Sequence, residues 1–300
     1  MTQFLKDIFK SKKKKPEVIP DLGTKPLSED QLQTVSVSQV VIKPSQLLIG
    51  CAQSVGKQRD HNEDTLFTLS AVISDGNTEL PFGLFIVADG MGGHLHGEIA
   101  SGVAARAVAQ YTMDKLYPSL LGLQQETQNE SLQEIMEGGI REAQQTVVKR
   151  APGGGTTLTA ALVIGEQVTI AHVGDSRAYF IYPDGRMQSM TQDHSLVRRL
   201  VELGQMTEQD AASSSQRNIL YRAIGQLEPF RPDINTYLFP RPGSVLLCSD
   251  GLWVVVPEAD IFDVVSTTPN PSLACHKLVE MANTAGGPDN ISVILVQYIS

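Results

Sequence analysis

The sequence predicts an α+β domain built in layers. From about residue 46 onward, short apolar runs are separated by turn signals, a pattern typical of β-strands. Other stretches carry apolar residues at helical spacing. Because the strands come in runs and do not alternate regularly with helices, a layered α+β fold is favoured over a parallel doubly wound sheet.

Eight segments are predicted to be strands. They span residues 47–52, 65–69, 83–88, 157–164, 168–173, 178–182, 244–248 and 291–298. The fourth and fifth are separated by Gly165-Glu166-Gln167, and a connection of this length that contains glycine indicates a β-hairpin.

Helices are predicted over residues 98–112, 129–150 and 271–285. The second places apolar residues such as Ile135, Ile140 and Val147 on one face. The third follows Asn270 as its N-cap and stops at Gly286-Gly287, which are the start and stop signals of a helix.

The chain is acidic overall. Its 24 Lys and Arg residues against 33 Asp and Glu residues give a formal net charge of −9, which argues against a nucleic-acid-binding protein. Cys51, Cys248 and Cys275 are far apart, so neither a disulfide framework nor a zinc ribbon is indicated. No apolar run approaches the length of about 20 residues that spans a bilayer. Lys6 and Asp7 interrupt the apolar residues of the N-terminus, so no secretory signal is expected, and we predict a cytoplasmic protein.

Residues 1–44 are predicted to be a disordered, lysine-rich arm that precedes a domain spanning residues 45–300. The first 15 residues contain six lysines and one acidic residue, a net charge of +5. Leu5, Ile8 and Phe9 stand at helical spacing among these lysines. The arm is therefore either a weak contact to anionic membranes or a solubilising tail.

Acidic residues mark the tips of the apolar strands. Four strands have an aspartate at one end, and a fifth is preceded by an acidic pair; these residues are Asp89, Asp175, Asp250, Asp289 and the pair Glu63-Asp64. Taken one at a time, each fits a turn. If the strands share neighbouring sheets, however, their tips bring the carboxylates together, where they repel unless a cation holds them. Oxygen ligands favour Mg²⁺ or Mn²⁺, so the pattern predicts a multi-metal site.

Seven motifs that contain these acids occur in an order that resembles a known family. They are Arg59-Asp60-His61-Asn62-Glu63-Asp64, 87–94 (VADGMGGH), 155–159 (GTTLT), 172–177 (HVGDSR), 191–195 (TQDHS), 249–253 (SDGLW) and 286–292 (GGPDNIS). Across residues 47–298 the chain is similar to the metal-dependent serine/threonine protein phosphatases of the type 2C (PPM) family, of the bacterial type. The resemblance implies a four-layer αββα sandwich of two antiparallel sheets flanked by helix pairs.

The resemblance also implies the roles of the acids. Asp89 bridges two metal ions, with the Gly90 carbonyl as a further ligand; Asp250 and Asp289 complete one ion's shell, and Glu63 and Asp64 hold the second. Asp175, together with Asp250, resembles the pair that holds a weaker third ion. The implied cofactor is Mn²⁺ or Mg²⁺, two or three ions, which activate the water that hydrolyses phosphoserine and phosphothreonine.

Other site residues follow from the same motifs. Arg59 resembles the arginine that grips the substrate phosphate, because its guanidinium bonds two phosphate oxygens at once. His94 either protonates the leaving alkoxide or is a structural loop histidine. His61 and His194 are candidates for supporting groups, Arg177 for bracing the Asp175 loop, and Trp253 is assigned to the core. Thr156, Thr157 and Thr159 are assigned to packing or support.

The flap of such enzymes falls at about residues 196–224. Many bacterial relatives have a His-Pro pair there, whereas this chain has Ser213-Ser214-Ser215-Gln216, which puts its substrate preference in question. Phosphoprotein substrates are expected, possible partners are a serine/threonine kinase and its targets, and the chain is expected to be a monomer. A phosphatase with a cysteine nucleophile is strongly disfavoured, because none of the three cysteines is followed by an arginine six positions later. A pseudophosphatase that acts as a binding module is disfavoured because the acids are intact.

Overall fold

The computed structural model describes residues 44–74, 79–92, 95–121, 130–226 and 230–299. These residues belong to one compact unit. The predicted lysine-rich arm lies almost entirely in residues 1–43, outside the described part of the chain. Among the described residues, no helix combines the length and apolar character needed to cross a bilayer.

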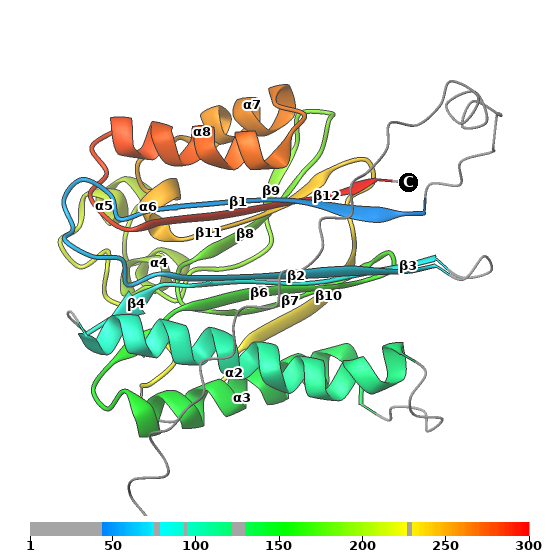
Figure 1. Ribbon diagram of the computed structural model, residues 1–300. Helices are drawn as coiled ribbons and strands as arrows, with labels where there is room; N and C mark the ends of the chain where they lie inside the picture. Colours follow the sequence, from blue (N-terminus) through cyan, green and yellow to red (C-terminus); the bar gives the residue numbers. More distant parts are fainter. Residues whose placement is uncertain (1–43, 75–78, 93–94, 122–129, 227–229, 300) are drawn as a thin grey trace, which may run out of the picture. The chain divides into compact units, whose positions relative to one another are not determined.

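Two five-stranded antiparallel sheets stack face to face in the middle of the domain (Figure 1). Sheet I has the order β1 (Gln46–Ser54), β12 (Ile291–Ile299), β11 (Ser244–Cys248), β8 (Arg177–Ile181) and β9 (Met187–Ser189). Sheet II has the order β10 (Asp233–Leu238), β7 (Gln167–Val173), β6 (Leu158–Ile164), β3 (Glu79–Ala88) and β2 (Thr65–Ser74). A short ribbon pairs β4 (Gly90–Met91) with β5 (Gly155–Thr156) directly after β3.

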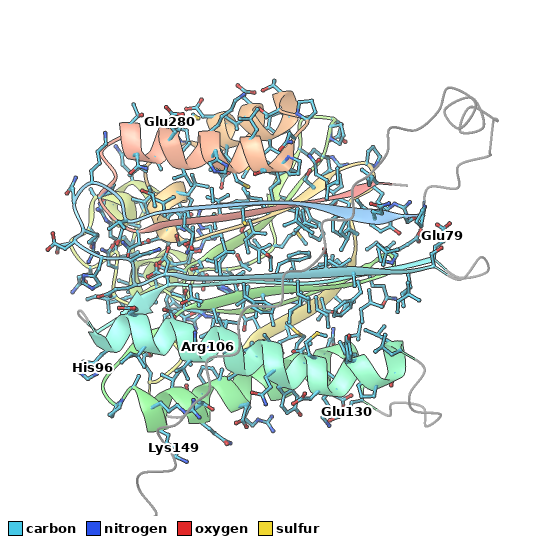
Figure 2. The ribbon with its side chains drawn as sticks, in the orientation of Figure 1. Glu79, His96, Arg106, Glu130, Lys149 and Glu280 are labelled. Atoms are coloured by element: carbon cyan, nitrogen blue, oxygen red, sulfur yellow. The ribbon has the colours of Figure 1, made fainter. Side chains whose placement is uncertain are left out.

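Helices cover the outer face of each sheet (Figure 1). α2 (Leu95–Leu120) and α3 (Leu132–Arg150) lie on sheet II, and α7 (Glu258–Thr267) and α8 (Pro271–Thr284) lie on sheet I. Charged residues of these helices, such as Arg106, Lys149 and Glu280, are on their solvent sides (Figure 2). Three shorter helices complete the described fold: α4 (Leu196–Glu202), α5 (Glu208–Ser213) and α6 (Asp250–Trp253). The first two fall within the predicted flap, residues 196–224.

The continuous apolar run of β3 explains how four layers are held together. Successive side chains of a strand point to opposite faces. Phe85 and Val87 therefore join the core between the two sheets, while Leu84 and Ile86 join the core beneath α2 and α3. A third core lies between sheet I and the α7–α8 pair. A strand that is buried on both faces has an unbroken run of apolar residues, and such runs could be recognised in the sequence.

The fold class predicted from the sequence is confirmed, with differences at the elements' ends. The first predicted helix, residues 98–112, extends over 26 residues as α2, because its apolar side chains continue to pack on α3 and sheet II. α3 ends at Arg150 as predicted but begins at Leu132, three residues after the predicted start, because Ser131 and Glu134 form a capping box there. β10 was not predicted, since this edge strand is half exposed and lacks an apolar run. α7 was also missed, although Pro257 and two acids in its first turn are helix-start signals.

Candidate metal centre at the strand tips

Five of the six acids predicted at the strand tips, all except Asp64, line one pocket of about 220 Å³. Sheet II contributes Asp89 from the end of β3, sheet I contributes Asp250 after β11 and Asp289 before β12, and the loop between β7 and β8 contributes Asp175. We call this the strand-tip pocket; its lining residues are Arg59, Glu63, Asp89, Gly90, Met91, Gly92, Thr157, Asp175, Asn218, Leu220, Asp250, Asp289 and Asn290.

Asp64 lies buried just behind the pocket. Its Oδ2 accepts hydrogen bonds from the hydroxyls of Ser249 at 2.9 Å and Ser292 at 2.7 Å. Its Oδ1 is buried and has no hydrogen-bond partner. Burial, with the nearby charges of Asp250 and Asp289, raises the pKa of Asp64 to about 7. One oxygen of this carboxylate is thus fixed by the protein and the other is left for a ligand.

The pKa values of three aspartates that line the pocket, Asp89, Asp175 and Asp250, are raised as well. Burial and the charge of Asp289 raise the pKa of Asp250 to about 6, and Asp250 Oδ1 is likewise buried without a partner. Burial and neighbouring carboxylates raise the pKa of Asp89 and of Asp175 well above 3.8. Such clustered, desolvated carboxyls are stabilised by a cation.

The donor set fits divalent metal ions with a preference for oxygen. Among the described residues, no group of three or more Asp, Glu, His or Cys side chains is arranged as a ready ligand set for one ion. Two buried carboxylate oxygens nevertheless lack partners in the site, and bound cations would satisfy both of them. Carboxylate and carbonyl oxygens suit Mg²⁺ and Mn²⁺.

Asn290 holds the Glu63-Asp64 segment against sheet I. Its Oδ1 accepts from the Glu63 amide at 2.8 Å, and its Nδ2 donates to the carbonyls of Val55 at 2.8 Å and His61 at 2.9 Å. This role was not predicted from the sequence, where Asn290 appeared only as part of a motif. His61 Nε2 contacts Glu63 Oε1 at 3.0 Å, so His61 supports an acid of the pocket.

Glycine is required where the acidic loops approach each other. A Cβ on Gly90 would stand 2.4 Å from the carbonyl oxygen of Gly97 and 2.6 Å from that of Glu63. A Cβ on Gly97 would stand 2.5 Å from Glu63 Oε2. These approaches let Glu63, on the segment before β2, lie beside the end of β3 and the start of α2.

The threonines after Gly155 fix the backbone of Asp89. The Thr156 hydroxyl and the Thr157 amide donate to the Asp89 carbonyl, both at 2.8 Å, and the Thr157 hydroxyl accepts from the Asp89 amide at 3.0 Å. Thr159 bonds His172 and the Ser176 carbonyl, farther from the pocket. Of the two roles predicted for these threonines, packing or support of the site, the contacts of Thr156 and Thr157 favour support.

Arg59 stands at the mouth of the pocket. Its Nη2 donates to Asp289 Oδ2 at 2.7 Å, and about half of its side chain, 49%, is exposed. His94, predicted either as a proton donor or as a structural histidine, lies outside the described residues.

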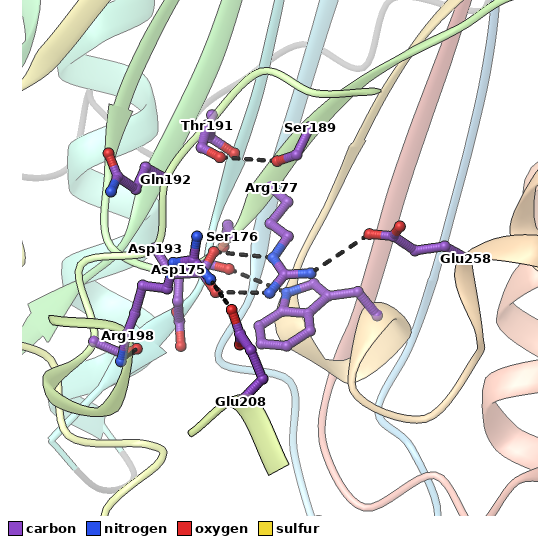
Figure 3. Close-up of polar contacts among 12 residues, drawn as sticks. Asp175, Ser176, Arg177, Ser189, Thr191, Gln192, Asp193, Arg198, Glu208 and Glu258 are labelled. Atoms are coloured by element: carbon purple, nitrogen blue, oxygen red, sulfur yellow. Dashed lines mark hydrogen bonds and ion pairs between the residues drawn. The ribbon is translucent and has the colours of Figure 1, made fainter. Parts of the chain in front are cut away.

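Arg177, Asp193 and Trp253 brace the Asp175 loop; Figure 3 shows the ion pair of Arg177 with Asp193 beside Asp175. Arg177 donates to both carboxylate oxygens of Asp193, at 2.9 and 2.7 Å, and its guanidinium carbon lies 3.5 Å from the centre of the Trp253 ring. Trp253 Nε1 donates to the Asp175 carbonyl at 3.1 Å. Trp253 therefore packs against the core, as predicted, and also supports the site, which had not been assigned to it. Asp193 was missed as well.

We expect the metal-free protein to lose stability as the pH rises from 6.5 to 8. A carboxyl whose pKa is raised by folding keeps a proton that the unfolded chain has already lost, so the free energy of unfolding falls with rising pH until the folded pKa is passed. For Asp64 that range runs from 3.8 to about 7, and Asp89 and Asp175 act in the same direction. The expected loss is about 1 kcal/mol or more, at about 1.4 kcal/mol per pH unit for each group that titrates.

Urea unfolding in EDTA and in excess Mn²⁺, at pH 6.5 and pH 8, measures this effect. Burial lowers the pKa of His172 to about 3 and also lowers the pKa of His194, whereas a histidine of the unfolded chain is still half protonated at pH 6.5. Each of these histidines therefore adds at most about 0.4 kcal/mol of stability between pH 6.5 and pH 8, which is less than the combined loss expected from the three carboxyls. Mn²⁺ should remove most of the pH dependence. Stability in EDTA that is unchanged or higher at pH 8 would contradict the assignment of clustered carboxyls.

Comparison with known proteins identifies relatives over most of the chain. The family model described as protein phosphatase 2C matches residues 51–291. A serine/threonine phosphatase stp of Listeria innocua is 35% identical over 248 residues, covering 81% of this chain and 92% of the relative. The protein phosphatase PhpP of Streptococcus pneumoniae is 35% identical over 254 residues, covering 83% of this chain and 96% of the relative.

Solved structures with the same fold are also similar. The Mycobacterium tuberculosis serine/threonine phosphatase PstP/Ppp superposes with a TM-score of 0.68 at 30% identity, covering 84% of this chain and 98% of that one. A catalytic domain of PstP in complex with two manganese ions has a TM-score of 0.68 at 29% identity, covering 85% of this chain and 99% of that one.

Proposed function

This chain belongs to the protein phosphatase 2C family and is a metal-dependent serine/threonine protein phosphatase, and on that premise we propose that the strand-tip pocket is where it hydrolyses phosphoserine and phosphothreonine. One observation carries the assignment to this pocket. Asp64 and Asp250 each keep a buried carboxylate oxygen without a partner among acids from both sheets.

We propose that Glu63, Asp64, Asp89, Asp175, Asp250 and Asp289, with the Gly90 carbonyl, hold the Mn²⁺ or Mg²⁺ ions. When bound, the ions supply an acidic water near neutral pH and neutralise charge on the phosphoryl oxygens. The sheets place these acids at the ends of rigid strands, and Asn290 and Thr157 fix the backbones of Glu63 and Asp89. Little reorganisation is then needed when the ions bind, which favours electrostatic stabilisation of the transition state.

Two further roles complete the proposed mechanism. Arg59, half exposed at the mouth, binds the phosphate oxygens of the substrate, which orients the phosphoryl group above the carboxylates. His94, which directly precedes α2 in the sequence, is the proposed proton donor to the leaving serine or threonine oxygen, an assignment that rests on its motif alone.

The substrates are phosphoproteins, and we propose that the chain opposes a serine/threonine kinase, as a monomer in the cytoplasm. Its three cysteines are all free, which fits a reducing compartment. We also propose a weak contact of residues 1–15 with anionic membranes, which co-sedimentation of the full chain with phosphatidylserine vesicles, in low and high salt, would test.

Phosphate release from a phosphothreonine peptide tests the proposed site. We expect hydrolysis with Mn²⁺, loss of activity in EDTA, recovery when Mn²⁺ is restored, and loss of activity in Asp289→Ala. Asp114→Ala is the matched control, because Asp114 is exposed on α2 and does not line the strand-tip pocket. Full activity of Asp289→Ala, or full activity in EDTA, would refute the assignment.

A further inference from the structure

A buried histidine, His194, forms hydrogen bonds with both the carbonyl and the amide of Gly174, the residue before Asp175 of the strand-tip pocket. The His194 amide donates to the Gly174 carbonyl at 2.7 Å, and the Gly174 amide donates to His194 Nδ1 at 3.0 Å. The imidazole is almost completely buried, with 2% of the side chain exposed. Both polar groups of the residue before Asp175 therefore depend on His194.

These contacts fix the tautomer of His194. A backbone amide can only donate, so Nδ1 must be the unprotonated nitrogen and the proton must be on Nε2. Nε2 in turn donates to Asp233 Oδ2 at 3.0 Å. Burial lowers the pKa of His194, which agrees with a neutral ring.

Asp233 connects this histidine to the protein surface. It is the first residue of the edge strand β10, and 43% of its side chain is exposed. Its Oδ1 accepts from Arg222 Nη1 at 2.8 Å. The same Nη1 lies 3.0 Å from His194 Nε2, but both of these nitrogens are donors, and the Asp233 carboxylate is the acceptor that they share. Arg222 lies near the C-terminal end of the flap, residues 196–224, so a hydrogen-bonded series runs from the flap through Asp233 and His194 to Gly174.

The next residue of the loop, Asp175, is also hydrogen-bonded by its backbone. Trp253 Nε1 donates to the Asp175 carbonyl, and Gly174 has φ of +110°, where a Cβ would stand 2.5 Å from the Cβ of Thr157. The loop is thus hydrogen-bonded by His194 at Gly174 and by Trp253 at Asp175. The orientation of the Asp175 carboxylate follows from the loop conformation that these hydrogen bonds stabilise.

We propose that Asp233 is a positioning residue for Asp175, which acts by holding His194 in the Nε2–H tautomer. Without the carboxylate, Nε2–H has no acceptor of equal strength, and the proton can move to Nδ1. A proton on Nδ1 would point at the Gly174 amide hydrogen, and because both groups are donors they would repel each other. The backbone at Gly174 and Asp175 would then have to shift. The proposal rests on the proposed role of Asp175 as a metal ligand. Groups that orient ligand-bearing segments in this way influence metal affinity by about 10- to 100-fold.

The test is Asp233→Ala in the full chain, with two measurements that do not depend on turnover. Long-range ¹H–¹⁵N spectra of ¹⁵N-histidine-labelled protein report the tautomer of His194, with His194→Asn to assign its signals. Calorimetric titration with Mn²⁺ reports metal affinity. We expect the Nε2–H signature in the unsubstituted protein, a shift toward Nδ1–H in Asp233→Ala, and a roughly 10-fold or greater loss of affinity at the weakest Mn²⁺ site.

Two further variants separate positioning from general destabilisation. Glu166→Ala removes another carboxylate that accepts from an arginine, Arg241, at the far end of sheet II, and it should change neither measurement. In His194→Asn the side-chain oxygen can still accept from the Gly174 amide, so adding Asp233→Ala to that variant should reduce Mn²⁺ affinity no further.

Three results would overturn the proposal. They are an unchanged His194 tautomer in Asp233→Ala, an unchanged Mn²⁺ titration in that variant, or an equal effect of Glu166→Ala. Failure of the proposed metal role has a separate signature, since Asp175→Asn would then leave the Mn²⁺ titration unchanged. The tautomer measurement would still decide whether Asp233 positions His194.

Discussion

Asp89→Asn is expected to reduce kcat for a phosphothreonine peptide by on the order of 10³-fold at saturating Mn²⁺, with the fold intact. Asp89 ends β3 inside the strand-tip pocket, and the charges of Asp64 and Asp250 help to raise its pKa. Asparagine has nearly the same shape but lacks the charge of the carboxylate that we propose would hold the metal ions. The hydrogen bonds that Thr156 and Thr157 form with Asp89 involve its backbone and not its side chain, so they should persist in the variant.

The same substitution should leave the metal-free protein as stable as before, or more stable, because it removes one of several mutually repelling carboxylates. Thermal unfolding in EDTA measures this, and Asp114→Asn on α2 serves as the control for activity and stability alike. A kcat within 10-fold of the unsubstituted enzyme, from protein with normal Mn²⁺ affinity, would show that Asp89 is not a ligand.

The position of the acids could be predicted because strand boundaries are visible in the sequence. β3, β11 and β12 are buried on both faces and appear as unbroken apolar runs, so the polar residues that end them stand out. The strands' antiparallel pairing then brings alternate ends to one edge of each sheet. From residue type and strand position alone, turn residues and metal ligands could not be distinguished; the family resemblance carried by the ordered motifs favoured metal ligands.

Supporting residues were harder to predict because their roles depend on contacts across the fold. Asn290 and Val55, which share a hydrogen bond, are 235 residues apart in the chain. Asp233 is the first residue of the edge strand β10, whose composition does not predict a strand. Its partner His194 lies in the loop between β9 and α4. Trp253 was assigned to the core from its residue type, and only the fold shows where its indole nitrogen points. Local periodicity carries no information about such pairs.

Arg59→Ala is expected to separate substrate binding from metal binding. We expect KM for the phosphothreonine peptide to rise and kcat/KM to fall by about 10²-fold, because a charge-assisted contact with the phosphate is lost. Half of the Arg59 side chain is exposed, so the variant should fold normally.

The affinity for Mn²⁺ should change in the opposite direction or not at all. In the structure Arg59 donates to Asp289 Oδ2, one of the proposed ligand oxygens, so the arginine and a cation compete for the same carboxylate. Removing Arg59 frees Asp289, whereas removing Asp289 in Asp289→Ala deletes a ligand. Calorimetry with Mn²⁺ on both variants, alongside steady-state kinetics, distinguishes the two roles.

Arg59→Lys sharpens the argument, because it keeps the positive charge but not the forked geometry. An ammonium group cannot bond two phosphate oxygens in one plane as a guanidinium does. If Arg59 grips the phosphate, the lysine variant should recover only part of the lost kcat/KM. If the arginine merely balances the charge of the carboxylates, lysine should restore kcat/KM almost fully, and the phosphate-binding role would have to be given to another group at the mouth of the pocket.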